Sequence, residues 1–218
     1  VKLEETIVNL IDRGEKPKVV IVVHLYGQVA KIEEIAEICN KYNIYLIEDS
    51  TESLGSKYNE KMTGSFGDIG CFSFNGNKLI TTGGGGMLVT DNDEWAEKAR
   101  YLTTQAKDDP VQFIHNEIGY NYRLTNIQAA MGVAQLEQID GFIKKKRMIN
   151  DFYYDNLNNV NGITVTRERK NTCSNYWLST ILVDKEKFGS NSKKLYKKLR
   201  QEGIKVRPFF KPINQMPM

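Results

Sequence analysis

The feature that most constrains the fold is a pair of short apolar runs separated by one helix-length amphipathic segment. The runs are KVVIVV at Lys18–Val23 and IYLIE at Ile44–Glu48. Both are short and rich in β-branched residues, which is typical of strands buried in a parallel sheet. Between them, residues 31–42 place apolar side chains at helical spacing. A strand, a helix and a second strand in this order predict a right-handed parallel unit, and therefore an α/β fold.

The alternation of strands and helices continues and then changes character near residue 158. We expect further helices at 3–13, 93–102, 125–138 and 142–157, and further strands at 70–75 and 86–90. Beyond residue 162 the pattern predicts strands at 163–166, 176–183 and 204–207 and a basic helix at 192–202, with Gly203 as its C-cap. The C-terminal part is therefore predicted to be a small α+β lobe.

Composition excludes several classes of protein. The 30 basic and 27 acidic residues nearly balance, unlike the charge of a strongly electrostatic nucleic-acid binder. The sequence contains neither an apolar run of about 18 residues, which a membrane helix needs, nor a secretory signal. Three scattered cysteines predict a reduced, cytoplasmic protein, and two isolated histidines predict no metal site.

Asp49 directly follows the second predicted strand. Ligands bind at the carboxyl ends of the strands in open α/β sheets. An acidic residue there can pair with the ring nitrogen of pyridoxal phosphate, whose protonated ring accepts electrons from a carbanion. Alternatively, Asp49 only caps the next turn.

Lys78 ends a polar turn that follows the predicted strand at 70–75, and four glycines follow at Gly83–Gly86. A partly desolvated lysine at a strand end can act as a nucleophilic amine, and glycines allow close backbone approach to a planar cofactor or phosphate. A surface lysine beside a flexible loop is the alternative. The glycine run fits neither the dinucleotide fingerprint nor the P-loop pattern.

Four segments resemble the DegT/DnrJ/EryC1/StrS family of sugar aminotransferases, in that family's order and at similar spacing. They are Val22–Gly27, Ile47–Ser56, Gly64–Met87 and Gly119–Gln138. The resemblance implies a fold type I pyridoxal-phosphate-dependent transferase, similar to aspartate aminotransferase, with a mixed, mostly parallel sheet and helices on both faces. Residues 1–140 would form part of the large cofactor domain. Residues 141–218 would form a connecting helix and an incomplete small α+β domain, and the chain would lack segments at both ends.

The same resemblance implies roles for individual residues. Lys78 would carry the cofactor and move the proton during catalysis, while Asp49 would hold the pyridine nitrogen. Ser73 would bind the cofactor phosphate, and Glu52 stands where many relatives have Gln or His near the ring hydroxyl. Asn121 would reach the cofactor phosphate of a second subunit, which implies a homodimer with shared active sites. Glutamate would donate the amino group.

A finer resemblance points to the bacillosamine and legionaminic-acid branch. It is carried by FNGNK at Phe74–Lys78, TTGGGGM at Thr81–Met87, Asn175–Leu178 and the closing VRPFFKPINQMP. Such enzymes aminate C4 of a UDP- or GDP-linked 4-keto-6-deoxy-N-acetylglucosamine for surface-glycan or nonulosonic-acid biosynthesis, and the UDP-linked sugar is the expected substrate. The residues expected to contact the nucleotide-sugar are His24, Tyr26, Trp177 and Arg207. A plain core role is the alternative for Trp177.

Two other functions remain open at this point. A sugar dehydratase on the same scaffold would have histidine in place of the cofactor lysine, which Lys78 argues against. A catalytically incomplete fragment that keeps only the fold is the second alternative.

Overall fold

The computed structural model describes residues 2–217 and divides into two compact units. The first unit runs to Met148 and also includes Glu168–Leu178, whereas the second comprises Ile149–Arg167 and the chain from Ser179 onward. The predicted domain boundary between residues 140 and 141 remains a prediction. In the described part of the chain, no helix combines the length and the apolar character that crossing a membrane requires.

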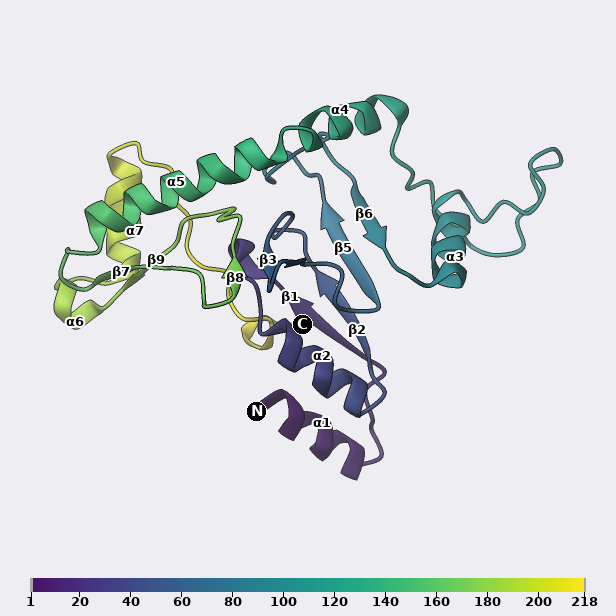
Figure 1. The fold of residues 1–218 in the computed structure, drawn as a ribbon, viewed down its shortest axis with the longest axis horizontal. Coiled ribbons are helices and arrows are strands. Elements are labelled where there is room, and N and C mark those ends of the chain that lie inside the picture. Colours follow the sequence, from purple (N-terminus) through teal and green to yellow (C-terminus); the bar gives the residue numbers. More distant parts are fainter. Residues whose placement is uncertain (1, 218) are drawn as a thin grey trace. The chain divides into compact units, whose positions relative to one another are not determined.

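The first unit is built on a four-stranded mixed sheet with the order β1-β2-β5-β6. Its strands are β1 (Val19–Val23), β2 (Tyr45–Asp49), β5 (Ile69–Ser73) and β6 (Gly86–Val89). The first three are parallel, and the arrow of β6 runs in the opposite direction (Figure 1). The predicted parallel unit and the mixed, mostly parallel sheet are therefore confirmed.

Two helices cover one face of this sheet, α1 (Lys2–Asp12) and α2 (Ile32–Lys41). The core under α2 contains Val22, Val29, Ile32, Cys39 and Leu46, and a second cluster contains Ile7, Ile38 and Ile44. Both clusters form because the apolar stripe of each helix faces alternate strand residues.

The opposite face of β1 is exposed. Ile21 is 64% exposed, and Val19 and Val23 are also exposed, whereas Val22 is buried. The predicted parallel strand is therefore confirmed in its pairing with β2, whereas only one of its two faces is buried among the described residues. The reason is geometric, since α1 and α2 cover only one of the two faces to which successive strand residues point.

The remaining elements of the first unit surround the sheet. They are η1 (Leu25–Gly27), β3 (Lys57–Tyr58), β4 (Lys61–Met62), β8 (Thr172–Cys173), α3 (Asp93–Thr103) and α4 (Asn126–Leu136). Strands β4, β3 and β8 form a small antiparallel sheet that the sequence did not predict. Thr125 and Gln128 form a capping box at the start of α4, which fixes where that predicted helix begins.

Helix α5 (Ile139–Leu157) passes from the first unit into the second. The second unit contains the antiparallel pair β7 (Ile163–Val165) and β9 (Ile181–Val183) and the helices α6 (Lys185–Phe188), α7 (Ser192–Gln201) and η2 (Ile213–Gln215). Gly203 has φ of 78° just beyond the end of α7, in agreement with a glycine that ends a helix.

One of the predicted strands is only partly formed in this region, and another is absent from the described residues. The strand predicted at 176–183 is reduced to Ile181–Val183, because residues 174–177 bond to first-unit loops instead of to a neighbouring strand. Residues 204–207 are irregular, and in the described chain they pair with no strand. A short apolar run predicts a strand only where a partner strand supplies the hydrogen bonds.

Candidate active site

Six of the predicted site residues follow the carboxyl ends of three parallel strands in the first unit. They are His24 and Tyr26 after β1, Asp49 and Glu52 at and after β2, and Ser73 and Lys78 at and after β5. The strands pair in register, with Val23 opposite Asp49 and Asp49 opposite Cys71, so the three strands end at one edge of the sheet. This edge is where open α/β sheets bind ligands.

The Lys78 amine lies in a partly enclosed position between a carboxylate and an aromatic ring. Its side chain is 14% exposed, and Nζ lies 3.7 Å from Oε1 of Glu52. Nζ also lies 4.6 Å from the ring centroid of Trp177. The backbone N–H of Lys78 donates to the carbonyl of Asn75, which closes the turn that presents the side chain. Lys78 is therefore not a surface lysine on a flexible loop.

Four predicted residues form one connected cluster around this amine. Oε2 of Glu52 accepts a hydrogen bond from the backbone N–H of Tyr26 at 2.8 Å. The ring of Tyr26 is stacked with that of Trp177, with centroids 6.4 Å apart and an angle of 9° between the planes. Lys78 contacts both Glu52 and Trp177, so residues from three distant parts of the sequence meet here.

Asp49 and Ser73 have local hydrogen bonds at their strand ends. Oδ1 of Asp49 accepts from the backbone N–H of Thr51 at 3.2 Å, as the turn-capping interpretation expects. Oγ of Ser73 accepts from the backbone N–H of Asn75 at 3.3 Å. Their roles toward a cofactor stay predictions.

His24 lies in the interior of the protein, where both of its ring nitrogens form hydrogen bonds. Its side chain is fully buried, Nε2 donates to Oε2 of Glu48 at 3.0 Å, and Nδ1 accepts from the backbone N–H of Ala30 at 3.0 Å. These two bonds fix the neutral tautomer that carries its proton on Nε2. Since both ring nitrogens are engaged inside the protein, we do not retain His24 as a sugar contact.

Glu48 is the residue whose importance the sequence reasoning missed. Its carboxylate is fully buried and accepts hydrogen bonds from His24 Nε2 and from the backbone N–H groups of Gly64, Phe66 and Gly67. Burial raises the pKa of Glu48, but these four hydrogen bonds outweigh burial and lower the pKa below its ordinary value. An acidic residue inside an apolar strand was the available signal, because a buried charge needs partners.

A second feature, whose contacts the sequence did not predict, is the segment Glu168–Leu178, which we call the strap. Asn175 of the strap is fully buried, and its amide nitrogen donates to the carbonyls of Glu52 and Leu54. The hydroxyls of Ser56 and Ser174 both donate to the carbonyl of Gly27. These bonds join the loops that follow β1 and β2, and no local pattern in the strap predicts them.

The start of the strap is held by Arg147 of α5. Its guanidinium forms a bidentate pair with Glu168, both bonds at 2.7 Å, and also donates to the carbonyl of Ser174. The hydrogen bonds to Glu168 raise the pKa of Arg147, against the opposing effect of burial. The neighbouring Lys146 donates to the carbonyl of Trp177 at 3.0 Å, and burial lowers the pKa of Lys146.

The absence of a side chain at Gly27 allows the strap to pack against the loop that follows β1. The substitution Gly27→Ala is therefore expected to weaken the fold. A Cβ at Gly27 would lie 1.9 Å from Oδ1 of Asn175, and φ of Gly27 is +85°. We expect a loss of about 2–4 kcal/mol in the free energy of unfolding, from the strained φ plus overpacking. Chemical denaturation measures this loss.

Gly14→Ala is the matched control for that substitution. Gly14 has φ of +74°, but a Cβ there would meet no atom within 4 Å. Gly14→Ala should therefore cost only about 1 kcal/mol, from the strained φ alone. Equal losses in the two variants would contradict a close approach of the strap at Gly27.

The last three predicted residues differ in their placement. Trp177 is only 3% exposed, so its ring packs inside the protein, and we do not retain it as a stacking surface for the nucleotide. Asn121 is exposed, and its backbone forms an isolated antiparallel β-bridge with Thr104. Arg207 is exposed and belongs to the second unit, so its proposed contact with the substrate remains a prediction.

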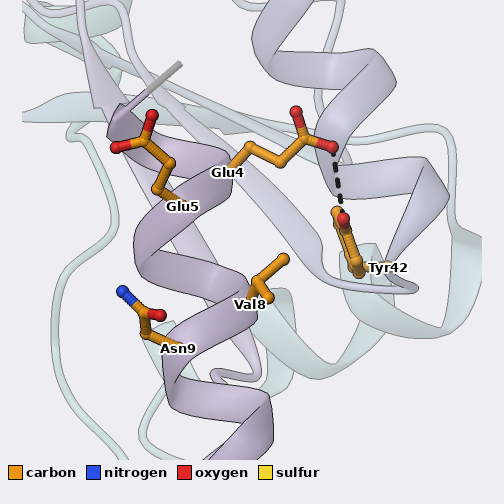
Figure 2. Close-up of a pocket in the computed structure, with 5 residues that line it drawn as sticks. All are labelled: Glu4, Glu5, Val8, Asn9 and Tyr42. Carbon is orange, nitrogen blue, oxygen red and sulfur yellow. Dashed lines mark hydrogen bonds between the residues drawn. The ribbon is translucent and has the colours of Figure 1, made fainter.

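A pocket on α1 lies away from the predicted residues. Figure 2 shows its lining residues, which are Glu4, Glu5, Val8, Asn9 and Tyr42. Tyr42 caps the end of α2 and precedes β2, so this pocket lies at the amino ends of the parallel strands. Glu4 already pairs with Lys41 at 2.7 Å and accepts a bond from Tyr42. This pocket therefore does not coincide with the strand-end site.

Comparison with known proteins places this arrangement in a family. The model of the DegT/DnrJ/EryC1/StrS aminotransferase family matches residues 4–218. EpsN of Bacillus subtilis (strain 168), which is assigned as a pyridoxal phosphate-dependent aminotransferase, is 44% identical over 99% of this chain and 55% of its own length. The GDP-perosamine synthase of Escherichia coli O157:H7 is 43% identical over 93% of this chain and 54% of its own length. The chain thus spans about half the length of the curated relatives it matches.

Solved structures share the same fold. PseC of Helicobacter pylori, an aminotransferase involved in the biosynthesis of pseudoaminic acid, is 29% identical with a TM-score of 0.87, over 97% of this chain and 57% of its own. The E. coli GDP-4-keto-6-deoxy-D-mannose-3-dehydratase, whose structure contains hydrated pyridoxal phosphate, is 27% identical with a TM-score of 0.80, over 89% of this chain and 54% of its own. The predicted fold class is confirmed, and the chain belongs to the DegT/DnrJ/EryC1/StrS aminotransferase family.

Proposed function

We propose that this protein transfers an amino group from glutamate to a nucleotide-linked 4-keto-6-deoxy sugar with pyridoxal phosphate as its cofactor. The observation that carries the proposal is the placement of the Lys78 amine. It lies 3.7 Å from Glu52 and is only 14% exposed, in the turn that follows β5. A partly enclosed primary amine at the ligand-binding edge of the sheet is suited to covalent chemistry with a carbonyl group.

The side chains at this edge fit the cofactor chemically. A carboxylate (Asp49), a primary amine (Lys78) and a hydroxyl (Ser73) follow adjacent parallel strands β2 and β5. They match a pyridine nitrogen, an aldehyde and a phosphate, respectively. When bound, pyridoxal phosphate supplies an aldehyde and a ring that accepts the electron pair released from the substrate carbon.

The residues of the chain have separate tasks in this proposal. Nζ of Lys78 would move a proton between the cofactor and the substrate carbon that bears the amino group. Asp49 would hold the pyridine nitrogen in its protonated form. The Glu52 carboxylate is itself fixed by the backbone N–H of Tyr26, 3.7 Å from the Lys78 amine, and would lie near the ring hydroxyl of the cofactor.

The relatives support the proposed substrate class. Besides the GDP-perosamine synthase, a Campylobacter jejuni relative 33% identical over 88% of this chain is a UDP-4-amino-4,6-dideoxy-N-acetyl-beta-L-altrosamine transaminase. Amination of UDP-4-keto-6-deoxy-N-acetylglucosamine is our specific proposal, with surface-glycan or nonulosonic-acid synthesis as its purpose. We also propose a homodimer in which Asn121 reaches the partner's cofactor phosphate and Arg207 pairs with the substrate diphosphate.

The first test is to locate the cofactor on the protein. Protein expressed from the complete gene and supplied with pyridoxal phosphate is expected to turn yellow. Borohydride reduction should then fix the cofactor mass on Lys78, because reduction makes the bond between amine and aldehyde permanent. Peptide mass spectrometry identifies the modified residue, and Lys146 of α5, which is also partly buried, is the internal control. Cofactor mass mainly on Lys146 or on exposed lysines would refute the proposed site.

The second test separates transferase from dehydratase. The protein is incubated with glutamate and a panel of UDP- and GDP-linked 4-keto-6-deoxy sugars. Mass spectrometry then identifies the sugar products. An amino sugar together with 2-oxoglutarate supports the proposal, and a deoxygenated keto-sugar would favour a dehydratase. The presence of Lys78 favours amino transfer, since capture of the aldehyde needs a primary amine.

A further inference from the structure

We propose that Trp177 of the strap is a positioning residue for the Lys78 amine. This inference rests on the proposed function, because it assigns Lys78 a reaction for which its position matters. Trp177 lies 99 residues beyond Lys78 in the sequence, and its expected role was a stacking surface for substrate. The structure gives it two separate contacts with the turn that carries Lys78.

The first contact fixes the backbone directly before Lys78. Nε1 of Trp177 donates a hydrogen bond to the carbonyl of Asn77 at 2.8 Å. That carbonyl belongs to the peptide unit that joins Asn77 to Lys78. An indole N–H can donate only one bond, and here it is used on the lysine turn.

The second contact involves the amine itself. Nζ of Lys78 lies 4.6 Å from the centroid of the Trp177 ring, within cation–π distance. On its other side Nζ lies 3.7 Å from Oε1 of Glu52, beyond hydrogen-bond distance. The amine is thus placed between a ring and a carboxylate and is not locked by a short ion pair.

Trp177 is rigid enough to set a position because each of its polar groups is used. Its backbone N–H donates to Oδ1 of Asn175 at 2.8 Å, and its carbonyl accepts from Nζ of Lys146. Its ring is stacked with that of Tyr26, and the residue is 3% exposed. A buried indole N–H needs an acceptor, and the acceptor here is the carbonyl joined to Lys78, so the packing of Trp177 and the position of the lysine turn are coupled.

The test compares Trp177→Phe and Trp177→Leu with Trp95→Phe. Phenylalanine keeps an aromatic face but loses the donor, and leucine loses both. Trp95, the other of the two tryptophans, is on α3 and contacts Tyr45 edge-to-face. Protein from the complete gene is used, and thermal unfolding of each variant shows whether it is folded at the assay temperature.

Two measurements report on Lys78 without requiring turnover. In cofactor-free protein, acetylation of Lys78 relative to exposed Lys144 is expected to rise about 5- to 10-fold in Trp177→Phe, because the loosened turn exposes the amine. At limiting pyridoxal phosphate, the borohydride-fixed adduct on Lys78 is expected to fall by a similar factor. Trp177→Leu should change both quantities further, and Trp95→Phe should change neither.

The outcomes separate this inference from the proposed function. If folded Trp177→Phe and Trp177→Leu leave both quantities unchanged, Trp177 has only a core role and the inference is overturned. If wild-type protein captures the cofactor on another residue, the proposed function fails, and the acetylation ratio alone then decides whether Trp177 positions Lys78. A rise in acetylation with a matching loss of adduct supports both.

Discussion

Replacing Lys78 by alanine is expected to lower kcat for amino transfer by about 10³-fold or more, because the variant lacks the amine that captures the aldehyde and moves the proton. The fold should survive, since the ion pair lost among the described residues is the long 3.7 Å contact with Glu52. Glu52 keeps its hydrogen bond from the backbone of Tyr26. Steady-state kinetics with glutamate and the keto-sugar measure the effect.

Two further variants make the Lys78 experiment specific. Lys78→Arg keeps the positive charge but lacks a nucleophilic amine, so it should be as inactive as Lys78→Ala. Lys144→Ala, which removes an exposed lysine of α5, should retain wild-type activity. An active Lys78→Arg enzyme would show that position 78 supplies only charge, and the proposed chemistry would be wrong.

The second large effect is expected for Glu48→Gln, which should lower the free energy of unfolding by about 3 kcal/mol at pH 7. One carboxylate oxygen of Glu48 accepts from His24 and Gly64, and the other accepts from Phe66 and Gly67. A glutamine side chain would put its amide nitrogen, itself a donor, at the position of one of these two oxygens, where it would face two other donors. His24 cannot relieve the conflict by moving its proton to Nδ1, because Nδ1 accepts from the N–H of Ala30.

The effect of Glu48→Gln should depend on pH in a defined direction. The pKa of Glu48 is lowered in the folded protein because its hydrogen bonds outweigh the effect of burial. The ionised side chain therefore stabilises the fold fully above its ordinary pKa of 4.5 and loses this contribution as the pH falls through the lower folded value. The stability difference between wild type and Glu48→Gln should accordingly shrink below pH 4.5.

Urea denaturation at several pH values measures this difference. Glu34→Gln is the control, because Glu34 forms an exposed pair with Lys31 on α2 and should change stability by less than about 1 kcal/mol. A difference between wild type and Glu48→Gln that stays constant from pH 7 down to pH 3.5 would contradict the role assigned to the ionised carboxylate.

Most of the sheet and helix positions were predictable because they follow from local periodicity. The strand runs at 18–23 and 44–48 became β1 and β2, and the amphipathic stretch between them became α2. The strand at 176–183 was largely wrong, because a strand needs a partner and the strap instead bonds to loops after β1 and β2. The apolar character of a segment alone does not show which strand or loop will form hydrogen bonds with it.

Part of the candidate site was also predictable. Lys78 was singled out from a strand end and from the family resemblance, and Glu52 from the resemblance alone. The structure brings them within 3.7 Å. His24 follows a strand end just as convincingly, yet its ring is buried against Glu48. A position in a loop does not show whether a side chain turns toward a ligand or toward the core.

The sequence by itself determined the parallel unit, the strand-end placement of Asp49, Ser73 and Lys78, and the family, because periodicity and motif spacing are properties of neighbouring residues. The tertiary structure alone decided that Glu48 pairs with His24 and that Trp177 lies against Lys78. Glu48 lies 24 positions after His24 in the sequence, and Trp177 lies 99 positions after Lys78. Such pairs form only when the packed sheet and the strap bring buried polar groups to partners that satisfy them.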